Sequence, residues 1–314
     1  VVGMSYLMYF IFNIFLEDKF ETNSIKKLSR WIVVLGTGFF AFSPWQFFFS
    51  RASFESGVAL FFVIWGTVFF LHSLKLEKKK QFIFISLSAF SFVLSLYTYH
   101  STKIFSPLLV VALIIFFKDK VLKNIQKYLI GLLIGTCLLL PLVYDSVWGK
   151  GATRLSQTSI ISDKNLTIPQ KFETFFINYV THFTPAFLVG GETTTLRHGD
   201  GHWGVLTFSE LTIFVGTLMN ILYKKYILKD KTEFTIKTNK IVMFGSIWIL
   251  IGILPAAIGF EVPHANRALL SYPGFIIVEL TGLFLLGFEI YSKLQQSQIS
   301  SSAHSGTSVL AMKS

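Results

Sequence analysis

Cationic and imidazole side chains recur in four short stretches of this sequence, each beside a long apolar run. The stretches are 50–55, 97–103, 196–204 and 261–267. Arginine binds a phosphate group through two parallel hydrogen bonds, and histidine can donate a hydrogen bond to an anion or carry a proton. If the chain brings the four stretches together, they predict a site for an anionic group.

Eight residues of these stretches are the candidate ligand-binding residues. Residues three or four apart share a face if they lie on one helix, as His264 and Arg267 or Arg51 and Glu55 would. The Arg51–Glu55 pair is equally well explained as a local ion pair, and interfacial tyrosines are common in membrane proteins. The predicted substrate-binding set is Arg51, Glu55, Tyr99, His100, Arg197, His198, His264 and Arg267.

A metal site has weaker support. His198, Asp200 and His202 carry ligand types that suit a metal ion, but no clear second cluster accompanies them. Cys137 is the only cysteine, which excludes a metal cluster built from cysteines. We therefore predict no bound metal and no cofactor.

The composition places these residues in a membrane protein. The chain has 314 residues, of which 52% are hydrophobic and 14% charged, whereas a soluble domain carries roughly 25% charged residues. The net charge of +11 could indicate nucleic-acid binding. The basic residues stand in short connections between apolar runs, however, which is typical of a membrane protein and argues against a nucleic-acid partner.

The apolar runs predict an all-α polytopic membrane protein with about nine transmembrane helices, since a span needs roughly 20 apolar residues. One transmembrane domain covers 1–290, and a Ser/Gln-rich tail at 291–314 is expected to be disordered. The long loop 145–204 contains a possible interfacial helix near 168–182. Glu210 and Glu279 fall inside spans and are expected to face the bundle interior. The predicted spans are 1–16, 31–49, 55–74, 81–98, 104–117, 128–144, 205–223, 241–260 and 268–290.

Lysine and arginine set the sidedness of these spans. One set of alternate connections, with the tail, holds 20 of the 28 basic residues, and the other set holds 8. The richer set is expected to be cytoplasmic. All four polar stretches then lie on the extracytoplasmic face, and the first span begins outside. An outside start predicts that a helix and an outer loop precede Val1.

At the same residues the sequence resembles the GT-C glycosyltransferases, and within them the branch similar to protein mannosyltransferases and aminoarabinose transferases. The resemblance extends to about residue 290. It is carried by four short motifs, which keep their order and share one side of the membrane: Ser43-Pro44-Trp45 with Ser50-Arg51-Ala52-Ser53-Phe54-Glu55, Tyr97-Thr98-Tyr99-His100, Leu196-Arg197-His198-Gly199, and Pro263-His264-Ala265-Asn266-Arg267-Ala268.

The resemblance implies an inverting transfer of a sugar from a polyprenyl phosphate to a glycan, lipid or protein acceptor at the outer face of the plasma membrane. It implies that Arg267 and Arg197 bind the phosphate, assisted by His264 and His100. Arg51 and Glu55 would shape the cavity or contact the sugar. The family's general base is an acidic residue of the first outer loop, so we expect it upstream of Val1 and expect this chain alone to be inactive.

Two other classes of protein remain open. A transporter or flippase of lipid-linked glycans would also be polytopic, but it typically has polar sites near the middle of the membrane. Here only Glu210 and Glu279 are expected at such depth. A non-catalytic scaffold would leave the four polar stretches unexplained.

Overall fold

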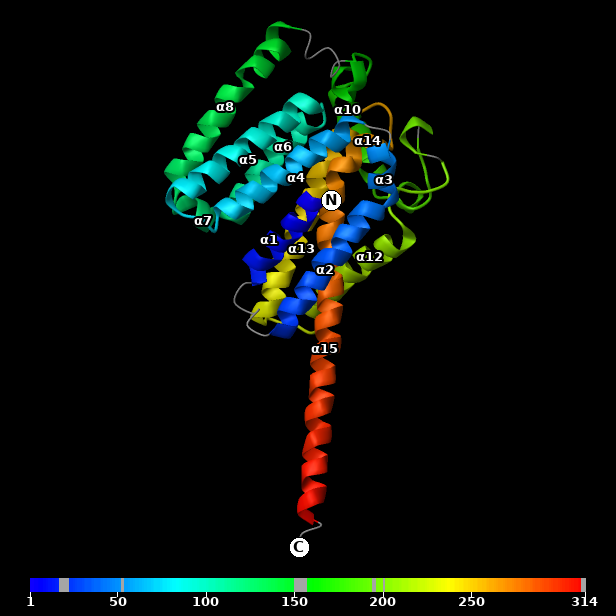
Figure 1. The fold of residues 1–314 in the computed structure, drawn as a ribbon. Coiled ribbons are helices and arrows are strands. Elements are labelled where there is room, and N and C mark those ends of the chain that lie inside the picture. Colours follow the sequence, from blue (N-terminus) through cyan, green and yellow to red (C-terminus); the bar gives the residue numbers. More distant parts are fainter. Residues whose placement is uncertain (17–22, 52–53, 150–156, 194–195, 200, 312–314) are drawn as a thin grey trace.

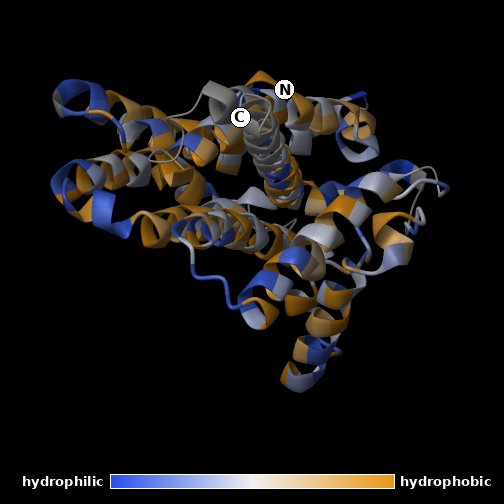
Figure 2. Ribbon diagram, turned by 90° about the horizontal axis from the view of Figure 1, so that it is seen from below, coloured by the Kyte–Doolittle hydropathy of each residue, from blue (hydrophilic) through white to orange (hydrophobic). Residues whose placement is uncertain are grey.

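The computed structural model describes residues 1–16, 23–51, 54–149, 157–193, 196–199 and 201–311. It is 82% helical, and the described residues form no named strand. The prediction of an all-α protein is therefore confirmed. Figure 2 shows that hydrophobic residues dominate the helices, while hydrophilic residues gather at helix ends and in connections.

The first three helices contain part of the predicted motif that begins at Ser43. They are α1 (Val2–Leu16), α2 (Asn23–Phe42) and α3 (Pro44–Arg51). The part of α2 from Arg30 and the whole of α3 are bent by 52° at Ser43. Proline fits the first position of a helix because its missing N–H would be unsatisfied there. Pro44 therefore begins α3 in a new direction, where a single span over 31–49 was expected.

A hairpin and the three helices that follow it form one side of the bundle (Figure 1). The hairpin consists of α4 (Glu55–Ser73) and α5 (Lys78–Thr98), and α6 (Thr102–Phe116), α7 (Lys118–Leu122) and α8 (Ile125–Trp148) follow. Helix α8 packs mainly on α5 and leaves most of its apolar surface exposed. An exposed apolar face of this kind suits lipid, because water would penalise it.

The long loop contains a longer helix, α10 (Ile168–Thr181), and three short helical segments. These are η2 (Ile160–Ser162), α11 (Pro185–Leu188) and η3 (Leu196–His198). The helix expected near 168–182 is thus present. It is capped at its start by Thr167 and Gln170, whose side chain accepts a hydrogen bond from the Thr167 N–H at 2.9 Å.

The last helices form the centre of the molecule. They are α12 (Phe208–Leu222), η4 (Tyr223–Ile227), α13 (Glu233–Ala257), α14 (Ala265–Ala268), η5 (Leu269–Ser271) and α15 (Tyr272–Ala311). Close contact between α13 and α15 depends on glycine. A Cβ at Gly274 would lie 2.6 Å from the Gly245 carbonyl oxygen, so only glycines permit this approach.

Two acidic side chains are buried in this central region, as expected. Glu210 lies in the first turn of α12 and accepts hydrogen bonds from the Thr207 N–H at 2.7 Å and from the Tyr272 hydroxyl at 2.9 Å. Glu279 is fully buried, and neither of its carboxyl oxygens has a hydrogen-bond partner among the described residues.

Five helices are long and apolar enough to cross a membrane: α4, α5, α8, α13 and the helix that covers Ala265–Gln295. The bent α2–α3 pair would make a sixth. These features fit a multi-pass membrane protein. At three further positions predicted to span, the structure has shorter helices of 15 residues, namely α1, α6 and α12.

Helix α15 continues to Ala311, through the segment expected to be disordered. Residues 288–305 contain neither Pro nor Gly, so no residue there interrupts a helix that the buried part of α15 has already begun. This C-terminal part runs away from the other elements (Figure 1).

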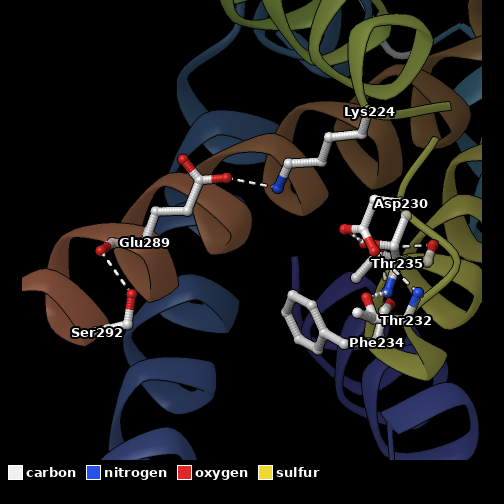
Figure 3. A network of polar contacts seen from close by, with 8 residues as sticks. Lys224, Asp230, Thr232, Phe234, Thr235, Glu289 and Ser292 are labelled. Atoms are coloured by element: carbon white, nitrogen blue, oxygen red, sulfur yellow. Dashed lines mark hydrogen bonds and ion pairs between the residues drawn. The ribbon is translucent and has the colours of Figure 1, made fainter. Parts of the chain in front are cut away.

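A polar network joins the start of η4 and the start of α13 to α15 (Figure 3). Lys224 and Glu289 form an ion pair at 2.5 Å, and Asp230 accepts hydrogen bonds from the Thr232 N–H at 2.8 Å and the Thr235 hydroxyl at 2.6 Å. The Asp230 bonds fix the first turn of α13.

We expect Lys224→Met to lower the free energy of unfolding by less than about 1 kcal/mol, because Glu289 is partly exposed and such pairs contribute little. Chemical denaturation in detergent would measure the change. A loss above about 2 kcal/mol would show that this contact holds α15 in place.

Candidate functional site

A cavity of about 320 Å³ lies where the end of α13, the turn into α14, the start of α4, the α5–α6 turn and η3 meet. Figure 1 shows α14, α10 and α3 at one end of the molecule, and the start of α13 toward the other. Seven of the eight predicted substrate-binding residues line this cavity: Glu55, Tyr99, His100, Arg197, His198, His264 and Arg267. Four stretches far apart in the sequence therefore meet, as their shared sidedness predicted.

Arg51 is the exception, because it does not line the cavity. It was expected to share a helical face with Glu55, but α3 ends at Arg51 and α4 begins at Glu55. Between them Phe54 is extended, with φ −70° and ψ 145°. This break makes the shared-face prediction wrong for the pair.

The turn 261–267 is held from several sides. The Nδ1 atom of His264 accepts a hydrogen bond from the Arg267 N–H at 3.3 Å, which caps α14. The His264 N–H donates to Nε2 of His182 at 3.1 Å, and the Trp45 indole N–H donates to the Ala265 carbonyl at 2.9 Å. These bonds fix the backbone on which His264 and Arg267 stand, so the two side chains are pre-positioned.

Arg267 lies directly against the backbone of residue 259. A Cβ built on Gly259 would overlap the Arg267 Nη1 atom. The same segment pairs with residues 158–160: the Ile160 N–H donates to the Ile258 carbonyl at 3.0 Å, and the Phe260 N–H to the Thr158 carbonyl at 3.3 Å. Glycine at 259 therefore creates the space in which the guanidinium group sits.

A second arginine and a second histidine of the cavity, Arg197 and His198, come from η3. The rings of His198 and His264 lie with their centroids 4.2 Å apart and their planes at 31°. The guanidinium carbon of the exposed Arg197 lies 5.6 Å from the centre of the Phe54 ring, within the range of a cation–π contact. The structure thus places one arginine from η3 and one from α14 on the same cavity.

Three histidines of this region, His182, His198 and His264, are neutral at pH 7. Burial, and secondarily the Arg267 charge, lowers the pKa of His264 to about 3, and burial lowers the pKa of His182 to about 4. The pKa of His198 is also lowered, chiefly by burial, although the Glu261 carboxylate opposes the shift. Among the described residues that line the cavity, the fixed positive charges are therefore those of Arg197 and Arg267, while His264 can offer a neutral N–H.

Within the part of the chain that the structure describes, one group of residues could hold a metal ion. Ligand atoms of His198, Glu261 and His264 lie within 4.8 Å of one another. The hydrogen bonding of His264 argues against metal binding by this group. Its Nδ1 accepts from the Arg267 N–H, so the proton of the neutral ring is on Nε2, 3.7 Å from the nearer Glu261 oxygen. Metal binding at Nε2 would require that proton to leave the ring nitrogen. For the His198, Asp200 and His202 combination, Asp200 lies outside the described residues.

Several cavity residues were not among those predicted. They come from the loop segment 157–159 and from the wall around Phe54, Ile258 and Asn266. His182, which supports the turn from behind, was also missed. It meets His264 across 82 positions of sequence, and no local spacing signals such a contact.

Searches against protein-family models, curated proteins and solved structures found no match to this chain. The function of the protein is therefore inferred from the geometry of the cavity.

The buried histidines predict that stability depends on pH. An unfolded histidine has a pKa near 6.5, whereas His182 and His264 titrate near 4 and 3 in the folded protein. Because these folded pKa values are depressed, the stability is fully present above about pH 6.5 and is lost as pH falls below it.

At pH 5 each histidine is expected to remove on the order of 1–2 kcal/mol. Melting temperatures in detergent between pH 7.5 and 5 would measure this, and His182→Gln should flatten the curve. A flat curve for the unaltered protein would contradict the neutral assignments.

Proposed function

We propose that the chain binds the phosphate of a sugar carried by a polyprenyl phosphate, as a membrane glycosyltransferase similar to the GT-C enzymes would. The observation that carries this proposal is the convergence of Arg197 and Arg267 on one cavity beside neutral imidazoles. Two guanidinium groups match the charge of a phosphate monoester or diester, and a neutral N–H of His264 can add a hydrogen bond.

The membrane topology belongs to the same proposal. We propose that α1, α6 and α12 also cross the membrane, which gives nine spans with the α2–α3 pair counted as one. The lysine-rich connections would be cytoplasmic and the cavity would open on the extracytoplasmic side of the plasma membrane. A lipid-linked donor could then place its phosphate in the cavity while its polyprenyl chain stays in the bilayer.

The proposed chemistry is an inverting displacement. The acceptor hydroxyl oxygen bonds to the anomeric carbon as the bond from that carbon to the phosphate oxygen breaks, and polyprenyl phosphate leaves. Arg197 and Arg267 stabilise the charge that develops on the leaving phosphate. Glu55 lines the cavity with its carboxylate available to accept hydrogen bonds from sugar hydroxyls. The general base that takes the acceptor's proton is not assigned to a residue of this chain.

One observation favours the alternative of a transporter or flippase. Glu279 is buried near the middle of the candidate span Ala265–Gln295 with no hydrogen-bond partner among the described residues, and such residues often mark ion or substrate paths. The cavity lies at the end of the helices, however, and its arginines suit binding at a membrane surface better than alternating access.

Two assays on the protein in proteoliposomes separate the two functions. We expect label from a polyprenyl-phosphate sugar to appear covalently on an added acceptor, with no movement of the lipid-linked sugar between leaflets beyond the rate of protein-free vesicles. Flux without transfer would favour the transporter and overturn the proposal.

A further inference from the structure

Helix α10 presents an apolar stripe that no other described element covers. Ile168, Phe172, Phe176 and Val180 follow one another at four-residue spacing, so they share one side of the helix. Phe172 is 71% exposed and Phe176 is 67% exposed. Two phenylalanines open to water would be costly, so the stripe calls for an apolar partner.

The other sides of α10 have different neighbours. Gln170 and Thr174 lie on an edge roughly opposite the stripe, where polar groups can meet water or lipid headgroups. The remaining edge contacts the protein through Asn178, Tyr179 and His182. A helix with one apolar, one polar and one protein-bound edge has the pattern of a helix that lies in a membrane interface.

The contacts with α13 give the depth of α10. The Tyr179 hydroxyl donates to the Leu250 carbonyl at 2.9 Å, and the Asn178 side-chain N–H donates to the Ala257 carbonyl at 3.1 Å. Both acceptors belong to the candidate span Glu233–Ala257. Leu250 and Ala257 are separated by about 10 Å along the helix. The end of α10 therefore lies beside the final turns of a membrane-spanning helix, at the level of lipid.

We propose that α10 docks on the lipid acyl chains of the leaflet on the cavity side, with Ile168, Phe172, Phe176 and Val180 as the inserted residues. The depth argument favours lipid over a second copy of the chain, because the neighbouring Leu250 is itself 47% exposed within a span and also requires apolar surroundings. This lipid contact does not depend on the proposed function.

The same helix supports the wall of the cavity. The Asn178 side-chain N–H also donates to the Gly259 carbonyl at 3.2 Å, and Nε2 of His182 accepts from the His264 N–H. Lipid bound to the outer side of α10 would thus hold in place the segment that carries Gly259 and His264. This consequence rests on the proposed function, in which that segment binds the donor phosphate.

Depth-dependent fluorescence quenching tests the docking directly. Cys137 is first changed to Ser, and an environment-sensitive fluorophore is attached to cysteine in Phe176→Cys and, as a second position, Phe172→Cys. The protein is placed in nanodiscs whose lipids carry a nitroxide on the acyl chain. Thr174→Cys on the polar edge is the negative control, and Leu133→Cys on the exposed face of α8 is the positive control.

We expect label at 176 and 172 to be quenched several-fold more than label at 174 and to a degree near that at 133. Quenching at 176 and 172 no greater than at 174 would overturn the proposal. Energy transfer between identical labels at 176, without quenching by lipid, would indicate a second copy of the chain on the stripe and would also overturn the proposal. Unchanged melting temperatures establish that the labelled variants are folded. No phosphate ligand enters the assay, so its outcome is independent of the proposed function.

Discussion

Replacing Arg267 with alanine is expected to weaken binding of a long-chain polyprenyl monophosphate by about 100-fold. The guanidinium group lines the cavity at a fixed place against Gly259, and a charge-assisted hydrogen bond to a ligand contributes about 1.5–3 kcal/mol. Binding to the protein in nanodiscs would be measured against the uncharged polyprenol, whose affinity should not change. Sugar transfer to an added acceptor should fall by a similar factor.

Two matched variants sharpen this result. Arg51→Ala removes an exposed arginine at the end of α3, outside the cavity, and should leave binding unchanged. Arg197→Ala should weaken binding by about 10-fold, because Arg197 is more exposed and water compensates part of its loss. Equal affinity for the phosphate lipid in the unaltered protein and in Arg267→Ala would refute the phosphate assignment.

Gly259→Ala is expected to weaken binding of the same lipid by about 10-fold while the melting temperature stays within a few degrees. The new Cβ would take the place of the Arg267 Nη1 atom, which it would overlap. The side chain of Arg267 is flexible, so it can move aside at little cost to the fold. The charge remains in the protein, but it leaves the position in which it meets the phosphate.

Gly57→Ala is the control for this substitution. Gly57 lies in the first turn of α4 near the cavity, and a Cβ there meets no atom within 4 Å. Its affinity should equal that of the unaltered protein. If Gly259→Ala also bound normally, the position of the Arg267 guanidinium would be unimportant and the cavity would not be a preorganised phosphate site.

Much of the fold could be predicted from the sequence because lipid imposes a simple requirement. A helix that crosses hydrocarbon must be long and apolar, so α4, α5, α8, α13 and α15 correspond to predicted runs. The bend between α2 and α3 was not predicted. Pro44 was visible, but proline is tolerated near helix ends, and only packing of α3 decides the new direction.

The candidate site was predictable to a similar extent and for a related reason. Alternate connections of a polytopic protein share a side of the membrane, so the pattern of basic residues is enough to place His100 and Arg197 at the same end of the helices. Sidedness does not give contacts. The support of His264 by His182 and the packing of Arg267 on Gly259 depend on how the loop folds, and no spacing in the sequence reports them.

The most direct test of the central claim is photocrosslinking with a polyprenyl phosphate that carries a photoreactive group next to the phosphate. After irradiation in nanodiscs, digestion and mass spectrometry would locate the attached lipid. We predict modified peptides from 196–199 and 258–267, with modification reduced by Arg267→Ala and by competing unlabelled lipid. Modification confined to the lysine-rich connections at 75–80, 118–127 or 224–231 would place the phosphate at the opposite end of the helices and would contradict the proposed site.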